Sequence, residues 1–340
     1  MMSEGILIGF RLHTVMVLLN SIKIDPPILN SSCAWSSDLQ QLTDLYESPY
    51  TGAVTTRTAT LHGFIEDASH TVAFSASGHT TLNSYGYSPH PLSKYLDWVL
   101  AILSAHPTST KPVIISITAS DPATLDSMVL SIQTLREKIS DGSSSRIAIE
   151  LNTSCPNIPN ASPSGYSFSA LLPSLQVLAD AHSKDLTLSI GLKLPPYVYK
   201  DQFSEAIAGI KSLSVLSDDG IVKNPVAFLT CTNTLGNSLL FSEQTMTTGD
   251  QIFAIPTTLG GLAGDPLHPL ALGNVFTFKN LMSSQEAKDA GIGHIKIIGV
   301  GGVTSREAAI RMRNAGALVV GCATLFGKEG VRAFEIIGKE

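Results

Sequence analysis

The stretch Arg146-Ile-Ala-Ile-Glu-Leu-Asn152 decides the fold, because it is an almost continuous apolar run that leads into a helical segment and a second apolar run. The helical segment covers Ser169–His182, and the second run covers Leu186–Lys193. Strands that are buried on both faces read as continuous apolar runs rather than as alternating patterns. This order predicts two parallel strands with a crossover helix between them.

Similar units follow one another along the whole chain. The candidate strands are Ile28–Ser31, Ala53–Arg57, Val113–Ala119, Ile147–Asn152, Leu186–Lys193, Val226–Asn233, Ile295–Gly301 and Ala317–Cys322. The candidate helices are Asp38–Tyr46, Ser93–His106, Ala123–Ile139, Ser169–His182, Gln202–Ile210 and Ser305–Asn314. Eight parallel strands with alternating helices are typical of the (β/α)8 TIM barrel, an α/β fold.

The length of 340 residues would suit two average domains, but a barrel uses about 250 residues or more as one unit. No internal repeat or linker divides the chain. We therefore predict one barrel domain over residues 21–340, preceded by an extension at residues 1–20. Two stretches fit no simple strand–helix unit: Leu61–Pro91 predicts an excursion over one barrel end, and the Ser/Gly/Pro-rich stretch Ile158–Ser167 predicts a mobile loop.

Composition excludes several classes of protein. With 44% hydrophobic and 15% charged residues the chain is globular, and a net charge of −6 argues against binding to nucleic acid or to an anionic membrane surface. The four cysteines are scattered, without a CxxC pair or a histidine at metal-ligand spacing, which predicts no metal and a reduced, cytoplasmic setting.

The N-terminal stretch Gly5–Leu19 is apolar, but Arg11 and His13 interrupt it, and it is shorter than the ~20 residues of a membrane span. We therefore expect no transmembrane anchor. An organellar address remains an alternative, because the segment contains an arginine and no acid after Glu4.

Polar side chains stand at the ends of successive predicted strands, where barrel enzymes carry their active sites. Asn152, Asn157 and Asn233 would direct amide groups at one mouth, which suits a planar ligand with alternating carbonyl and N–H groups. Each asparagine alone could equally end a strand or cap a turn. Three of them at successive strand ends favour a binding site.

Lys193 follows an apolar strand and precedes Pro195 and Pro196, so its ammonium group should face the mouth. A fixed positive charge there could stabilise an anion that develops on a bound ring. The alternatives are a Schiff-base lysine and a lysine that extends to solvent.

Cys155 lies beside Pro156 in a polar loop, whereas Cys231 and Cys322 lie in apolar strands. A loop thiol near a positive group can be a base or a nucleophile. Isolated cysteines are more often inert core residues, and we keep that interpretation for Cys33.

Glycines cluster at the ends of the last two predicted strands. Gly301 and Gly302 lead into Thr304, and residues 321–324 read Gly-Cys-Ala-Thr. Loops at these two positions, with a helix N-terminus behind them, form the phosphate site of many barrel enzymes. A second cluster, Leu259–Gly264, fits the same side, although a plain surface turn would explain it too.

Five motifs, in this order along the chain, closely resemble those of the dihydroorotate dehydrogenase family. They are Glu-Leu-Asn-Thr-Ser-Cys-Pro-Asn (150–157), Gly-Leu-Lys-Leu-Pro-Pro-Tyr (191–197), Thr-Asn-Thr-Leu-Gly-Asn (232–237), Gly-Gly-Leu-Ala-Gly (260–264) and Ile-Ile-Gly-Val-Gly-Gly-Val (297–303). The resemblance runs from about Pro27 to Gly330 and is specific in combination. It implies an FMN-dependent oxidation of dihydroorotate to orotate in pyrimidine biosynthesis.

The resemblance also implies roles for single residues. Cys155 would remove the C5 proton of dihydroorotate while hydride passes from C6 to the flavin, and Lys193 would stabilise negative charge at the flavin pyrimidine edge. Substrate would contact Asn83, Asn152, Asn157, Asn233, Thr234 and Arg57. FMN would contact Ser31, Ser32, Lys193, Gly261, Gly301, Gly302, Ala323 and Thr324.

A cysteine base resembles the soluble class of the family, of which we favour the homodimer that fumarate reoxidises. Two features depart from that class. Arg57 stands where a lysine is usual, and Glu66-Asp-Ala-Ser-His70 replaces the Pro-Arg-Tyr segment before the loop of Asn83. Three alternatives therefore stay open: an FMN barrel acting on another pyrimidine such as uracil, a flavin-binding homologue without turnover, and a Schiff-base lyase using Lys193.

Overall fold

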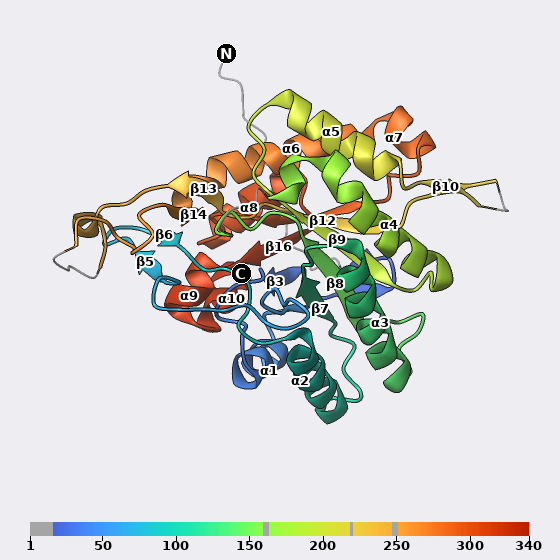
Figure 1. Cartoon of the computed structure of the whole chain (residues 1–340), viewed down its shortest axis with the longest axis horizontal. Coiled ribbons are helices and arrows are strands. Elements are labelled where there is room, and N and C mark those ends of the chain that lie inside the picture. Colours follow the sequence, from blue (N-terminus) through green and yellow to red (C-terminus); the bar gives the residue numbers. More distant parts are fainter. Residues whose placement is uncertain (1–15, 159–162, 218–219, 247–250, 340) are drawn as a thin grey trace, which may run out of the picture.

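The computed structural model describes residues 16–158, 163–217, 220–246 and 251–339. Its central feature is a sheet of eight parallel strands in the order β3-β16-β15-β12-β9-β8-β7-β4. A parallel bridge from Leu29 to Ala53 joins β3 to β4 and closes the barrel (Figure 1). The strands are β3 (Ile28–Asn30), β4 (Val54–Thr55), β7 (Val113–Ile117), β8 (Ile147–Asn152), β9 (Ser189–Leu194), β12 (Val226–Cys231), β15 (Lys296–Val300) and β16 (Val319–Cys322). The predicted TIM barrel is confirmed.

A helix follows each barrel strand. These helices are α1 (Leu39–Glu47), α2 (Leu92–Ala105), α3 (Pro122–Lys138), α4 (Phe168–Lys184), α5 (Lys200–Lys211), α6 (His268–Ser283), α8 (Arg306–Ala315) and, after β16, α9 (Thr324–Glu329) with α10 (Arg332–Gly338). The short helix α7 (Gln285–Asp289) follows α6. Asp38, Asp121 and Ser305 cap α1, α3 and α8 by accepting a hydrogen bond from a first-turn backbone N–H.

A short hairpin, β1 (Val17–Leu19) and β2 (Ile22–Ile24), contributes buried side chains to the barrel interior. Leu19 and Ile22 belong to the same buried cluster as Ile114 and Phe228 of the barrel strands. The predicted boundary between residues 20 and 21 falls at the turn of this hairpin.

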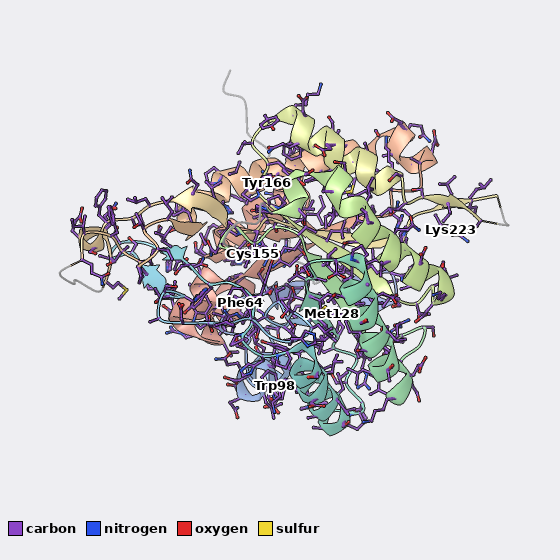
Figure 2. All side chains as sticks on the ribbon, in the orientation of Figure 1. Phe64, Trp98, Met128, Cys155, Tyr166 and Lys223 are labelled. Atoms are coloured by element: carbon purple, nitrogen blue, oxygen red, sulfur yellow. The ribbon has the colours of Figure 1, made fainter. Side chains whose placement is uncertain are left out.

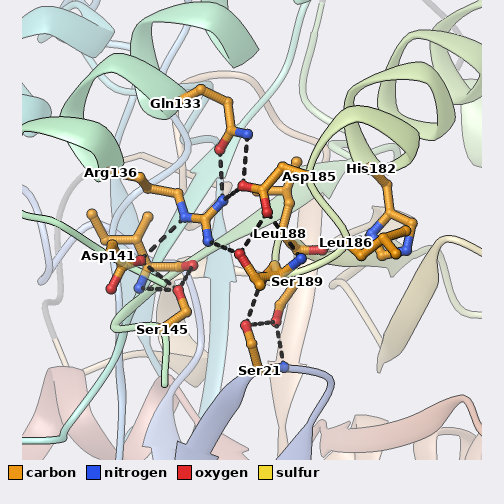
Figure 3. A network of polar contacts seen from close by, with 12 residues as sticks. Ser21, Gln133, Arg136, Asp141, Ser145, His182, Asp185, Leu186, Leu188 and Ser189 are labelled. Carbon is orange, nitrogen blue, oxygen red and sulfur yellow. Dashed lines mark hydrogen bonds and ion pairs between the residues drawn. The ribbon is translucent and has the colours of Figure 1, made fainter. Parts of the chain in front are cut away.

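A polar network ties the hairpin to two loops at the amino end of the barrel (Figure 3). The guanidinium of Arg136, on α3, donates to Asp141 at 3.1 Å, to Asp185 and to the hydroxyl of Thr187 at 2.8 Å. The hydroxyl of Ser21 in the hairpin turn donates to the carbonyl of Thr187. One buried arginine thus connects the segments that follow α3 and α4 with the hairpin.

A second sheet covers the opposite end of the barrel and appears on the left of Figure 1. It is antiparallel, in the order β13-β14-β6-β5, and its strands are β5 (Val72–Phe74), β6 (Thr80–Asn83), β13 (Leu235–Ser238) and β14 (Gly260–Gly264). The predicted excursion Leu61–Pro91 supplies β5 and β6. Residues 159–162 of the predicted loop lie outside the described residues, and Ser164–Tyr166 forms a 3-10 turn.

A two-stranded hairpin of β10 (Val215–Leu216) and β11 (Val222–Lys223) lies on the right of Figure 1, away from the second sheet. Two further 3-10 turns are Ser242–Gln244 and Asp265–Leu267. Within the described residues, every helix is too short or too polar to cross a membrane.

Candidate active site

A cavity lies between the carboxyl ends of the barrel strands and the second sheet, and encloses about 980 Å³ together with its open mouth. The predicted site residues that line it are Ser31, Ser32, Arg57, Asn83, Asn152, Cys155, Asn157, Lys193, Asn233, Thr234, Gly301, Gly302, Ala323 and Thr324. Gly261 is not among the described lining residues. It stands behind Thr234, where an added Cβ would lie 2.2 Å from the Thr234 hydroxyl oxygen.

Cys155 lies in the loop after β8, on the side of the barrel that faces the second sheet, whereas Lys223 lies on the opposite side (Figure 2). The Sγ of Cys155 is 3.9 Å from the carbonyl oxygen of Tyr85. Burial raises the pKa of the thiol, while the backbone N–H of Asn157 and the charges of Lys193 and Arg57 act to lower it. Burial has the larger effect, so the pKa of the thiol is raised overall, and the Asn157 N–H and the two cations offset part of that rise.

The asparagines form two hydrogen-bonded pairs. Asn157 donates from Nδ2 to the backbone and side-chain oxygens of Asn83, each at 3.1 Å, and to the carbonyl of Tyr85 at 2.9 Å. Asn233 donates from Nδ2 to the Oδ1 of Asn152 at 3.3 Å. The side-chain amides therefore hold one another in fixed orientations at the cavity wall.

Lys193, at the end of β9, is 4% exposed. Its Nζ donates to the backbone carbonyl of Ser32 at 3.2 Å. No carboxylate among the described residues forms an ion pair with it. Its positive charge is therefore available to a bound anion or polarised ring.

Arg57 is the second cation of the cavity wall, and it is held by Glu66. One guanidinium nitrogen lies 2.7 Å from a Glu66 carboxylate oxygen, and the other nitrogen lies 3.5 Å from the second oxygen. The guanidinium carbon also stands 5.2 Å from the ring centroid of Tyr85. The two departures noted in the sequence are thus partners, because the segment that replaces Pro-Arg-Tyr supplies the carboxylate for the unusual arginine.

Phe64 anchors this segment beside the loop of Asn83. Its backbone N–H donates to the carbonyl of Ser88 at 2.8 Å, and its ring packs edge-on against Tyr87. A Cβ on Gly86 would lie 2.4 Å from the Phe64 ring, so a residue without a side chain is required there. Phe64 therefore supports the loop of Asn83 from behind, and Val72 of the same segment lines the cavity itself.

The glycines after β15 let the backbone turn close to α6, because a Cβ on Gly301 would lie 2.6 Å from Ala271 and one on Gly302 would lie 2.5 Å from His268. Gly301 and Gly302 have φ values of 122° and 63°, which side chains rarely adopt. Helix α8 begins at Arg306, shortly after them, and α9 begins at Thr324 on the neighbouring strand end. Loops and helix starts arranged in this way can bind a phosphate group through backbone N–H donors.

One buried hydroxyl at the cavity lacks a partner. The Oγ1 of Thr232, which follows β12 and lines the cavity, has no hydrogen bond. A buried hydroxyl without a partner is costly, and a polar ligand would supply one. The glycine loops and this hydroxyl both fit a phosphorylated cofactor with a polar ring.

Several wall residues were not predicted from the sequence. Tyr85 and Tyr87 directly follow Asn83, and this proximity was the available signal. Glu66 is joined to Arg57 only by tertiary packing, which no local pattern reveals. Cys33, expected to be structural, lines the cavity, where burial raises the pKa of its thiol.

Comparisons with known proteins agree with the motifs. A family model described as dihydroorotate dehydrogenase matches residues 16–340. A "Putative dihydroorotate dehydrogenase A (fumarate)" of Streptococcus pyogenes serotype M5 is 30% identical over 264 residues, 76% of this chain and 71% of that protein. A "Probable dihydroorotate dehydrogenase A (fumarate)" of Streptococcus pneumoniae serotype 4 is 29% identical over 260 residues, with the same shares covered. A similarly named protein of Streptococcus agalactiae serotype Ia is 26% identical over 294 residues, 86% of this chain and 82% of that protein.

Proposed function

The chain belongs to the dihydroorotate dehydrogenase family, and on this basis we propose that it oxidises (S)-dihydroorotate to orotate, with FMN as its cofactor and fumarate as the final acceptor. The reaction would serve pyrimidine biosynthesis. The observation that carries the proposal is that Cys155, Lys193 and the asparagine pairs, drawn from different strand ends, line one cavity.

In this proposal Cys155 is the base. Its thiolate takes the proton from C5 of dihydroorotate, and the proton stays on Sγ until solvent removes it. Lys193 and Arg57 stabilise the thiolate before this step, because each acts to lower the pKa of the thiol.

The substrate would be oriented by the side-chain amides of Asn83, Asn152, Asn157 and Asn233 together with Thr234. Amides donate and accept hydrogen bonds side by side, as a carboxylate and a cyclic urea require. Arg57 would add donors for an anionic group. Because the amides already hold one another, little side-chain freedom is lost on binding.

FMN would be held by Gly301, Gly302, Ala323 and Thr324 at its phosphate and by Ser31, Ser32 and Lys193 at its ring system, with Gly261 supporting the wall through Thr234. Bound FMN would supply the acceptor for the hydride that leaves C6. Lys193 would stabilise negative charge that develops on the bound ring.

We also propose a homodimer in the cytoplasm. Residues 235–246 and 251–259 form an arm that begins with β13 of the second sheet, and Glu243 is the sole charged residue among those described. Its exposed apolar side chains are Leu239, Phe241, Met246, Ile252 and Leu259. An uncharged surface with exposed apolar groups suits a second copy of the chain.

One observation favours a second candidate, an FMN enzyme that acts on another pyrimidine. Arg57 is paired with Glu66, so a carboxylate lies close to the place where the substrate anion would bind.

Incubation of the purified protein with dihydroorotate and fumarate tests the proposed function, and should yield orotate and succinate. If the second candidate were right, orotate would be absent, and dihydrouracil would instead be oxidised to uracil while fumarate is reduced to succinate.

A further inference from the structure

Glu150 is a buried carboxylate to which the proposed chemistry gives no role. It lies on β8, two residues before Asn152, and is 2% exposed. Its oxygens accept hydrogen bonds from the hydroxyls of Ser116 at 3.2 Å and Thr230 at 2.6 Å. It forms no ion pair with any described residue. A buried carboxylate is costly, so its hydrogen-bond partners indicate what it does.

A chain of hydrogen bonds runs from Glu150 to the cavity. The Ser116 hydroxyl is 3.0 Å from that of Thr58, which in turn is 3.0 Å from the hydroxyl of Ser32. Thr58 also accepts from the Nδ2 of Asn152 at 2.9 Å. The chain therefore ends on two residues that line the cavity.

The direction of every hydroxyl–hydroxyl bond in this chain follows from the carboxylate. An ionised carboxylate can only accept, so Ser116 must donate its single hydrogen to Glu150. Thr58 must then donate its own hydrogen to Ser116, and both Ser32 and Asn152 must donate to Thr58. A neutral group in place of Glu150 would leave the directions of the hydroxyl–hydroxyl bonds undetermined, whereas the backbone N–H of Ser154 fixes the Asn152 amide by donating to its Oδ1.

We propose that Glu150 is a positioning residue that fixes the hydrogen-bond polarity of one part of the cavity wall, acting through the hydroxyls of Ser116 and Thr58 on the hydroxyl of Ser32. Ser32 then offers only its lone pairs to a ligand, because its hydrogen is used. Asn152 keeps Nδ2 toward Thr58 and its Oδ1 toward Asn233 and the backbone N–H of Ser154, at 3.3 and 3.1 Å.

The affinity of the cavity for FMN and orotate should depend on this hydrogen-bond polarity. This prediction rests on the proposed function. Glu150→Gln keeps the shape but can donate to Ser116 and reverse the chain, so that Thr58 donates to Ser32 and the Ser32 hydrogen is free to point at a ligand. Ser116→Ala cuts the chain while the Glu150 side chain keeps its place. Each variant should weaken FMN and orotate binding about fivefold to tenfold, the effect of one misdirected hydrogen bond.

Thr230→Val is the matched control. Thr230→Val removes the second hydroxyl that donates to Glu150, so it disturbs the same carboxylate. It leaves the hydrogen bonds through Ser116 and Thr58 to the cavity intact. Thermal stability should fall in all three variants, whereas affinities for FMN and orotate in Thr230→Val should stay within about twofold of wild type. The Glu150→Gln/Ser116→Ala double variant should bind no more weakly than either single variant, because both act on one path.

The side-chain amide signals of Asn152 in a ¹⁵N spectrum of the protein without ligand give a readout that does not depend on the proposed chemistry. They should move in Glu150→Gln and Ser116→Ala and remain in place in Thr230→Val. Unmoved signals in Ser116→Ala, or equal shifts in Thr230→Val, would overturn the inference. Failure of the wild-type protein to bind FMN would count against the proposed function alone, since the amide signals would still decide the role of Glu150.

Discussion

Cys155 can act as a base only when it has lost its proton, and burial raises the pKa of its thiol above the ordinary value of 9.0. The thiolate is therefore a minor form at neutral pH, and its population increases about tenfold per pH unit below the pKa. We expect the rate of flavin reduction by dihydroorotate to rise with pH across the neutral and mildly alkaline range. Stopped-flow absorbance from pH 6 to pH 10 measures this rise, and a flat profile would argue against a thiol base.

Replacement of Cys155 separates catalysis from cofactor binding. Cys155→Ala should keep its FMN but reduce dihydroorotate oxidation by about 100-fold or more, since no base remains. Cys155→Ser should be slow at neutral pH and recover only at higher pH, because an alcohol ionises less readily than a thiol. Unchanged turnover in the alanine variant would remove Cys155 from the mechanism.

The Arg57–Glu66 pair predicts a binding defect that a neighbouring carboxylate does not share. Glu66→Gln removes the charge that holds the guanidinium, so the KM for dihydroorotate should rise about tenfold. Asp67→Asn is the control, because the Asp67 side chain is 67% exposed and contacts His70 and Ser69 rather than Arg57. Equal KM values in the two variants would show that substrate affinity does not depend on the Arg57–Glu66 ion pair itself.

Some residues of the candidate site could be predicted from the sequence, and others could not. The lysine, cysteine and asparagines of the site stand at strand ends in ordered motifs, so their positions could be predicted. Glu66 and Thr58 act through contacts that only the folded chain creates, and neither lies in a recognisable motif. Gly261 is predicted to touch the cofactor, and it packs against Thr234, which lines the cavity.

At the scale of elements, the eight barrel strands could be predicted because burial on both faces leaves an apolar run in the sequence. β4 is shorter than predicted because the N–H of Arg57 donates to Ser36 instead of to a neighbouring barrel strand. The second sheet was missed because its partners are distant in sequence: β6 pairs with β14, and Asn83 lies opposite Gly261. β14 reads Gly-Gly-Leu-Ala-Gly, a composition that suggests a turn rather than a strand.

The network at the amino end of the barrel predicts a loss of stability. Arg136→Met would leave Asp141, whose side chain is 2% exposed, buried without a counter-charge. The free energy of unfolding in urea should fall by about 3–5 kcal/mol. Lys339→Met, which breaks an exposed pair with Glu335, should change it by less than about 1 kcal/mol. Similar losses in the two variants would contradict the importance of the buried network.

Asp185 gives this network a pH dependence. Partial burial raises the pKa of Asp185, but hydrogen bonds from Thr187 and Gln133 and the charge of Arg136 lower it to about 2. A carboxyl whose pKa is depressed on folding stabilises the protein above its ordinary pKa of 3.8, and this contribution is lost as pH falls toward 2. Urea unfolding between pH 5 and pH 2 should show a smaller loss in Asp185→Asn than in wild type. Parallel curves would mean that Asp185 does not contribute.

For the whole molecule, the arm of residues 235–246 and 251–259 predicts how two copies meet. Ile252→Lys would place a charge on an apolar interface, so the variant should sediment as a monomer where the wild type sediments as a dimer. Leu216→Lys is a matched control, because both side chains are 70% exposed and Leu216 lies on the hairpin at the other side of the barrel. A monomeric wild type, or equal behaviour of the two variants, would contradict this placement.

The central claim is that this barrel binds FMN and passes electrons from dihydroorotate to it. The most direct measurement is an anaerobic absorbance spectrum of the purified protein before and after addition of dihydroorotate, followed by fumarate. We predict a flavin band that bleaches with dihydroorotate and returns with fumarate. A protein that stays colourless after incubation with FMN, or a flavin band that dihydroorotate does not bleach, would contradict the account.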